Sequence, residues 1–242
     1  MSRVDVLGVA IDDLSVPEAV GHALCLLDGR SAAYVVTPNP EIVMEARRNA
    51  ALREALGKAA LVLPDGVGLI YASRILGMPL RNRTPGIDFA SALFARMAEQ
   101  GKSVYLLGAK PGVAALAGER LAERFPGLVV TGFHDGYFDE DENDLVLEEI
   151  NAAAPDLLLV CLGSPKQEIW MKQNASRLNV GLMAGLGGAL DVYAGVVERA
   201  PRRWRELGLE WLYRLIKEPK RITRMVKLPK ILLAAIWKRI EG

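Results

Sequence analysis

A carboxylate and two polar side chains follow apolar runs that have the length of buried strands. Asp65 closely follows the run at residues 60–63, and Thr37 and Asn39 follow the run at residues 33–36. In an open α/β sheet, ligands bind outside the carboxyl ends of the strands, so these two segments nominate one shared polar pocket. A carboxylate there can serve as the general base that takes a proton from a substrate hydroxyl. We therefore predict an active site built on Asp65, Thr37 and Asn39.

Asp65 also has a structural alternative, because Asp is a good helix N-cap and a helix is expected to begin near Val67. The flanking glycines, Gly66 and Gly68, would let a ligand or a neighbouring backbone approach closely. The matching strand end at Thr37 favours the catalytic interpretation.

Three further turns lead from a strand into a helix and could bind phosphate through backbone N–H groups. They lie at residues 108–112, 163–168 and 185–190, and the second presents Lys166 and Gln167. None has the G-x-G-x-x-G spacing of a dinucleotide site, which disfavours a nicotinamide dehydrogenase. Solvation at the surface is the alternative for Lys166, whereas Gln167 lies just inside a helix start and is harder to assign to the surface.

Other charged side chains admit two interpretations each. Asp139 and Asp141 form a D-x-D pair of the kind that holds a divalent ion against a diphosphate. An acidic first helical turn explains them as well, and we prefer that interpretation, with no metal site. Arg83 and Arg214 could pair with phosphate groups or could be solvated, and the sequence alone does not choose between these roles.

Short apolar runs alternate with helical patterns along the chain as far as Asp191. The runs are continuous, which is typical of parallel strands covered on both faces. The sequence therefore predicts an α/β fold, a Rossmann-like and mostly parallel sheet with helices on both faces. Cys25 and Cys161 are expected to be free thiols packed in the core. The predicted strands are residues 4–11, 33–36, 60–63, 103–107, 128–131, 157–162 and 180–184.

The pattern changes after Asp191, and the charge changes with it. Residues 199–240 contain 13 lysines and arginines but only 3 glutamates, while the whole chain has a net charge of +1. We therefore predict a catalytic domain at residues 1–195 and a basic, amphipathic, helical appendage at residues 196–242.

The appendage carries an apolar stripe at helical spacing, with basic residues between its members. An anionic membrane surface suits such a helix, since each Lys or Arg contributes about 1 kcal/mol there. The alternative is that the stripe packs on the core or on a second copy of the chain. Pro229 is expected to kink or split the helix. The stripe consists of Ile222, Met225, Val226, Pro229, Leu232, Leu233, Ile236, Trp237 and Ile240.

Neither a membrane span nor a signal peptide is expected. The longest stretch without a charged residue has 13 residues, 178–190, and a span needs about 20. Asp5 precedes any apolar run of signal-peptide length. We expect a cytoplasmic protein that lies on the inner face of the membrane.

Six segments in this order resemble the WecG/TagA/CpsF family of glycosyltransferases, and residues 214–221 are most similar to its TagA branch. The resemblance covers nearly the whole chain. The segments are TPNPE (37–41), PDGVG (64–68), GSPKQE (163–168), GGALD (187–191), RAP (199–201) and GLEWLYR (208–214).

The resemblance implies an inverting glycosyl transfer that needs no metal or other cofactor. N-acetylmannosamine would pass from a UDP-sugar donor to the 4-hydroxyl of N-acetylglucosamine on undecaprenyl diphosphate, in wall teichoic acid synthesis. Asp65 would be the base, Thr37 and Asn39 would orient the reacting groups, and Gln167 would contact the donor. The UDP site would be lined by Gly108, Gly136, Tyr137 and Asp191. We further expect diphosphate or acceptor contacts from Arg83, Arg214, Arg221 and Arg224.

Two alternatives remain. The donor could be another UDP-sugar, such as UDP-N-acetylmannosaminuronic acid or UDP-glucose. The basic tail could bind nucleic acid, but it has few aromatic residues for base stacking, and its apolar stripe fits lipid better, so we expect no nucleic acid. Exposed apolar residues of the tail could also drive self-association.

Overall fold

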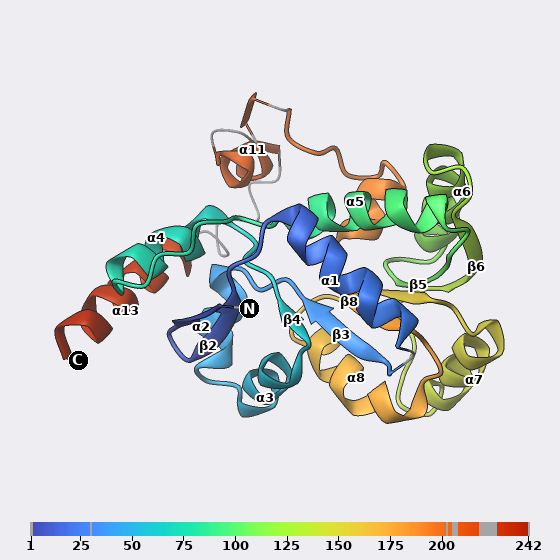
Figure 1. Cartoon of the computed structure of the whole chain (residues 1–242), viewed down its shortest axis with the longest axis horizontal. Coiled ribbons are helices and arrows are strands. Elements are labelled where there is room, and N and C mark those ends of the chain that lie inside the picture. Colours follow the sequence, from blue (N-terminus) through green and yellow to red (C-terminus); the bar gives the residue numbers. More distant parts are fainter. Residues whose placement is uncertain (1, 30, 202, 205–207, 218–226, 242) are drawn as a thin grey trace.

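The computed structural model describes residues 2–29, 31–201, 203–204, 208–217 and 227–241. Its centre is a six-stranded sheet with the order β4-β3-β8-β7-β5-β6, in which every neighbouring pair is parallel. The predicted α/β class is therefore confirmed (Figure 1). The strands are β3 (Ala33–Val36), β4 (Leu61–Val62), β5 (Ser103–Gly108), β6 (Val129–His134), β7 (Leu157–Cys161) and β8 (Leu182–Gly185).

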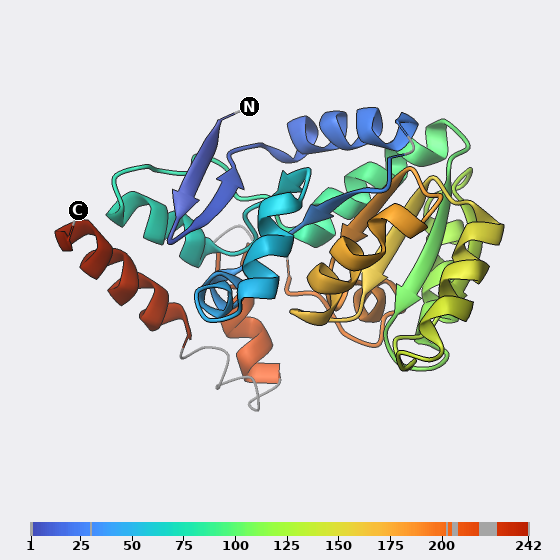
Figure 2. The same cartoon turned by 90° about the horizontal axis from the view of Figure 1, so that it is seen from below.

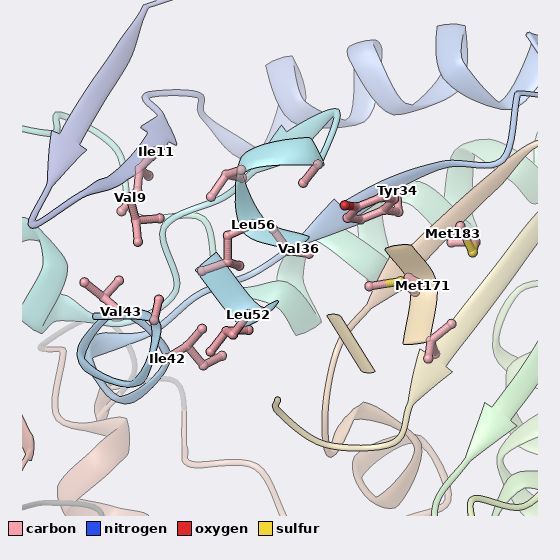
Figure 3. Packing of buried hydrophobic residues seen from close by; sticks show 14 of the residues in the cluster. Val9, Ile11, Tyr34, Val36, Ile42, Val43, Leu52, Leu56, Met171 and Met183 are labelled. Carbon is pink, nitrogen blue, oxygen red and sulfur yellow. The ribbon is translucent and has the colours of Figure 1, made fainter. Parts of the chain in front are cut away.

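The inner strands are apolar at successive positions because both faces of the sheet are buried. In β3, Tyr34 and Val36 face one hydrophobic cluster and Val35 faces the other. The cluster around Tyr34 also contains Leu52 and Met171 from the covering helices (Figure 3). Two-sided burial of this kind explains the continuous apolar runs in the sequence.

Helices cover both faces of the sheet (Figures 1 and 2). One cluster is closed by α1 (Val16–Asp28), α5 (Gly86–Glu99), α6 (Val113–Arg124) and α9 (Ala189–Tyr193). The other is closed by α2 (Pro40–Ala46), α3 (Ala50–Lys58), α4 (Val67–Ile75), α7 (Asn143–Ala153) and α8 (Lys166–Asn174), which continues into the short helix η1 (Ala175–Arg177).

The N-terminal segment differs from the prediction of a single strand over residues 4–11. It forms an antiparallel hairpin of β1 (Arg3–Val6) and β2 (Val9–Asp12), apart from the main sheet. The turn residues Leu7 and Gly8 both have positive φ angles, 57° and 90°. Two-residue hairpin loops favour this backbone twist, and Gly8 supplies it without strain.

Cys25 also differs from its prediction. Both cysteines are free thiols, but Cys25 is exposed on α1, and only Cys161 is buried. Burial raises the pKa of the Cys161 thiol to about 12, so this side chain behaves as an apolar packing group.

Two helices of the C-terminal segment are described, α11 (Glu210–Lys217) and α13 (Lys227–Glu241). α13 packs along α4 and α2 (Figures 1 and 2). Pro229 lies in its first turn, where a helix tolerates proline, so it does not interrupt the described helix. No helix in the described ranges is long and apolar enough to cross a membrane.

α13 has two apolar faces, whereas the sequence predicted one stripe. Ile231 and Ala235 are fully buried against the core, and Leu228 packs beside them. The described stripe residues from position 233 onward lie outside this contact. They are Leu233, Ile236, Trp237 and Ile240, with exposed fractions of 58%, 42%, 66% and 76%.

Candidate functional site

The carboxyl ends of β3 and β4 bring Thr37, Asn39 and Asp65 into one place, as the sequence predicted. The strands are parallel neighbours, and the Asp65 backbone N–H donates to the Pro38 carbonyl oxygen at 3.0 Å. The N-cap of α4 is Gly66, with a φ of 101°, and not Asp65. Asp65 therefore lies just before the positive end of a helix, which is a favourable place for a carboxylate.

Asn39 is the N-cap of α2. Its side-chain oxygen accepts from the backbone N–H groups of Glu41, at 2.8 Å, and of Ile42, at 3.1 Å. The side-chain amide nitrogen makes no hydrogen bond with any residue that the structure describes. Asn39 can therefore offer an N–H donor to a ligand while its oxygen holds the helix start.

Thr37 is buried, and its side chain is hydrogen-bonded to the neighbouring strand in the sheet, β8. Its Oγ1 donates to the carbonyl oxygen of Gly185, the last residue of β8, at 3.2 Å. A Cβ built on Gly86, at the start of α5, would lie 3.1 Å from the same Oγ1. The lack of a side chain at Gly86 therefore leaves room for this hydroxyl.

A second group of predicted residues gathers at the ends of β5 and β6. The Gly136 backbone N–H donates to the Ala109 carbonyl at 2.9 Å, and a Cβ on Gly136 would lie 3.3 Å from the Cα of Gly108. Tyr137 follows, with 69% of its surface exposed. Lys166 donates to the Gly136 carbonyl at 3.4 Å. These close approaches form a glycine-lined surface with an exposed aromatic ring beside it.

Gln167 and Asp191 lie between the two groups, after β7 and β8. Gln167 is only 3% exposed, and its Oε1 accepts from the Gly187 backbone N–H at 3.0 Å. Asp191 is half-buried in the first turn of α9, with a carboxylate oxygen 3.6 Å from a Cβ built on Gly188. Gln167 therefore holds the loop after β8, a role that the sequence did not predict.

All these residues share the carboxyl edge of one sheet. In the strand order, β8 and β7 separate β3 from β5, so the two groups are about 14 Å apart at the usual strand spacing. Helices α4, α8 and α9 also begin at this edge and direct backbone N–H groups toward it. The edge can hold an elongated anionic ligand with a reacting end near Asp65.

The predicted arginines are only partly placed. Arg83 lies near the start of α4, since both lie close to Gly208. A Cβ built on Gly208 would be 3.6 Å from Val67, the first residue of α4, and 4.0 Å from the Arg83 Nη1. Arg214 belongs to α11, whose backbone alone is described at this position. Arg221 and Arg224 lie outside the described residues.

The C-terminal segment reaches the same edge at two more points. A Cβ on Gly68 would lie 2.4 Å from Leu228 Cδ1 and 2.6 Å from Pro40 Cγ, so the lack of a side chain at position 68 lets Leu228 of α13 lie close to α4. At the start of the same segment, Arg199 forms an ion pair at 2.6 Å with Asp88, which lies in the first turn of α5. These contacts place the described parts of the appendage beside the strand ends.

The acidic segment before α7 has a structural role. The Asp139 carboxylate accepts from the backbone N–H groups of Asp141 and Glu142, both at 3.0 Å. Among the described residues, no group of three or more His, Cys, Asp or Glu side chains could hold a metal ion. A cavity of about 690 Å³ opens between this segment and α8, with Phe138 and Lys166 in its lining.

The match to known proteins extends over almost the entire chain. Residues 4–242 match the model of the glycosyl transferase WecG/TagA/CpsF family. A Bacillus spizizenii protein named N-acetylglucosaminyldiphosphoundecaprenol N-acetyl-beta-D-mannosaminyltransferase is 37% identical over 210 residues, which cover 87% of this chain and 81% of the relative. A Staphylococcus aureus (strain MW2) protein of the same name is 34% identical over 230 residues, 94% of this chain and 90% of the relative. The chain therefore belongs to the WecG/TagA/CpsF family of glycosyltransferases.

Proposed function

We propose that the chain transfers N-acetylmannosamine from UDP-N-acetylmannosamine to the 4-hydroxyl of N-acetylglucosamine on undecaprenyl diphosphate. The curated relatives carry the name of this activity. The observation that carries the proposal is the meeting of Asp65 with Thr37 and Asn39 at the ends of β3 and β4. A carboxylate beside two polar groups is the arrangement that activation of a hydroxyl requires.

The reaction is a single displacement with inversion. The acceptor O4 forms a bond to the anomeric carbon of the donor while the bond from that carbon to the UDP oxygen breaks. The proton of the acceptor hydroxyl passes to Asp65, and UDP leaves with the bonding electrons. Thr37 and Asn39 orient the reacting groups, since hydrogen bonds already fix one side of each residue. Fixed groups lose little freedom when the substrates bind.

The diphosphates need compensating charge, which we assign to arginines and helix N-termini. Arg83 lies near the start of α4, and Arg214, Arg221 and Arg224 belong to the basic C-terminal segment. The UDP site would be lined by Gly108, Gly136, Tyr137 and Asp191. Gln167 would hold the loop after β8 through its hydrogen bond with the Gly187 N–H. Backbone N–H groups at helix starts add donors that need no metal ion.

Release of UDP tests the donor and the metal requirement together. The enzyme is incubated in EDTA with a short-chain lipid diphosphate N-acetylglucosamine acceptor and, in turn, UDP-N-acetylmannosamine, UDP-N-acetylmannosaminuronic acid and UDP-glucose. We expect release that depends on the acceptor with the first donor alone. Release restored only by magnesium would contradict metal independence, and preference for another donor would contradict the sugar assignment.

We also infer that residues 196–242 form an appendage that binds the inner face of the cell membrane and closes over the site. The exposed stripe on α13 supports this, because Leu233, Ile236, Trp237 and Ile240 recur at the spacing of one helix face. The acceptor carries a lipid, so a helix that lies on the bilayer would bring the site to its substrate. Leu228, seated over Gly68, connects this helix to the strand ends.

Flotation with phosphatidylglycerol vesicles tests the membrane assignment. The double substitution Trp237→Ser and Ile240→Ser should lower vesicle binding at least about tenfold, since two largely exposed apolar side chains would no longer enter the bilayer. A matched control, Phe133→Ser with Leu145→Ser, removes exposed apolar groups from other elements and should leave binding unchanged. Equal vesicle binding by the two double variants would contradict membrane binding by the stripe. A change in the oligomer size of the Trp237→Ser and Ile240→Ser variant without vesicles would assign the stripe to self-association.

A further inference from the structure

Glu168 is a buried acidic residue that the proposed reaction does not use. It lies in the first turn of α8 and has no exposed surface. Its Oε1 accepts a hydrogen bond from Gln167 Nε2 at 2.8 Å. Its Oε2 is enclosed and has no partner of good hydrogen-bond geometry among the described residues, although the Ser164 side chain and the Glu168 backbone N–H also act on the carboxyl and lower its pKa. Burial of a polar atom without a partner costs free energy, so packing alone does not explain a glutamate here.

The carboxyl group determines which way the neighbouring amide points. Gln167 is almost fully buried, and its two amide ends have different partners: Nε2 donates to Glu168, while Oε1 accepts from the Gly187 N–H at 3.0 Å. If the amide were reversed, two N–H donors would face one another at Gly187, and two oxygens would face one another at Glu168. An acceptor at position 168 therefore selects the orientation that holds Gly187.

The segment held in this way also supports Thr37. The Gln167 amide packs against β8, because its Nε2 would lie 3.3 Å from a Cβ built on Gly185. The carbonyl oxygen of Gly185 accepts the Thr37 hydroxyl at 3.2 Å. Hydrogen bonds and contacts thus run from Glu168 through Gln167 to residues 185–187, and from there to Thr37 beside Asp65.

We propose that Glu168 is a positioning residue for the transferase: it fixes the Gln167 amide, which holds residues 185–187 and through them Thr37. The inference rests on the proposed function for its effect on turnover, but the effect on the loop after β8 is independent of it. Burial raises the pKa of the Glu168 carboxyl above its usual range. The Glu168 Oε1 acts as an acceptor for the Gln167 N–H, and a glutamine side chain also has such an oxygen, so an amide should replace the carboxyl.

Three substitutions separate positioning from stability. Glu168→Gln keeps the acceptor, whereas Glu168→Met and Glu168→Leu keep apolar bulk without one. We expect the two apolar variants to fold but to unfold at a lower urea concentration than the parent, because the buried Gln167 Nε2 loses its acceptor. Hydrogen exchange in residues 182–190 should be about five- to tenfold faster, the factor that one lost hydrogen bond produces. Their kcat should fall at least about tenfold, with smaller changes in KM for donor and acceptor. Glu168→Gln should match the parent in all three measurements.

Three other results overturn the inference. Parent-like exchange in residues 182–190 of both apolar variants would show that Glu168 does not hold the loop. Failure of both to fold would assign Glu168 to stability. Equal loss of kcat in Glu168→Gln would show that the charge, and not the acceptor, matters. If the parent itself turns over no UDP-N-acetylmannosamine, the proposed function fails, while the exchange comparison still decides whether Glu168 orients Gln167.

Discussion

Gly68 is the position where a single methyl group should separate α13 from the catalytic unit. The added Cβ of Gly68→Ala would lie 2.4 Å from Leu228 Cδ1 and 2.6 Å from Pro40 Cγ, whereas carbon atoms in contact are about 3.5–4.0 Å apart. The Leu228 methyl can rotate away, but the Pro40 ring cannot move without shifting the start of α2. The substitution therefore disturbs both the seat of α13 and the backbone next to Asn39.

The expected magnitude follows from two opposing contributions. Overpacking a closed contact costs about 1–3 kcal/mol, and replacing a helical glycine by alanine returns about 0.5–1 kcal/mol. We expect Gly68→Ala to lower the free energy of unfolding by up to about 2.5 kcal/mol. Gly57→Ala is the matched control, because it is also a helical glycine and has nothing within 4 Å of its Cβ. That control should be stabilised by the helix contribution alone.

Hydrogen exchange measured by mass spectrometry shows where the effect falls. Exchange in residues 227–241 should be faster in Gly68→Ala and unchanged in Gly57→Ala. Adding Leu228→Ala should cost less in the Gly68→Ala background than in the parent, since the methyl contact is then already lost. If Gly68→Ala is stabilised as much as Gly57→Ala and α13 exchanges at the parent rate, the packing argument is refuted.

Two further predictions concern residues around the site. Thr37→Val should lower the free energy of unfolding in urea by about 1–2 kcal/mol, since the buried Gly185 carbonyl loses its donor, and it should also lower kcat. Thr37→Ser should retain the parent stability and the parent kcat. Equal kcat in the two variants would contradict the role of the hydroxyl. For Asp13, burial alone would raise the carboxyl pKa, but hydrogen bonds from Arg81 and Asn82 hold it below its usual 3.8. The stabilisation by the Asp13 carboxylate is therefore present above about pH 4 and is lost as the pH falls further. Asp13→Asn should lower the free energy of unfolding by about 1 kcal/mol at pH 7 and by less at pH 3. An equal loss of stability at both pH values would contradict the role of the ionised carboxylate.

The sheet could be predicted from the sequence because its signal is local. Runs such as residues 33–36 and 157–161 are apolar at successive positions, and only two-sided burial in a parallel sheet explains that pattern. The hairpin was missed because Val4 to Ile11 contains enough apolar residues to resemble one strand. Gly8 was the available sign of a turn, since an isolated glycine in an apolar run often marks a break.

The meeting of Asp65 with Thr37 was predictable because parallel strands place their carboxyl ends at one edge. The connection between Gln167 and Gly187 was not, because it depends on how closely α8 packs against the sheet. Glu168 follows Lys166 and Gln167 at a helix start, where an acidic residue usually meets solvent. Its complete burial appears only in the packed structure.

The two apolar faces of α13 show a different limit. The spacing of apolar residues identifies the positions that share a helix face. It does not show which of two apolar faces packs against the rest of the protein. Contacts with α4 and α2 decide this, and they bury Ile231 and Ala235 and leave Trp237 exposed. One of those contacts lies at Gly68, far away in the sequence, where Leu228 occupies the space that a side chain would take.

Turnover by Asp65→Asn is the decisive test of Asp65 as the general base. The measurement is acceptor-dependent UDP release from UDP-N-acetylmannosamine in EDTA, together with UDP affinity and urea unfolding of each variant. Asp139→Asn is the control, because that carboxylate accepts from two backbone N–H groups before α7. We expect Asp65→Asn to lose a factor of about 10²–10⁴ in kcat, the usual contribution of a general base, and to keep the parent affinity for UDP. Asp139→Asn should keep the parent turnover. Turnover by Asp65→Asn within about threefold of the parent would contradict the assignment of Asp65 as the base.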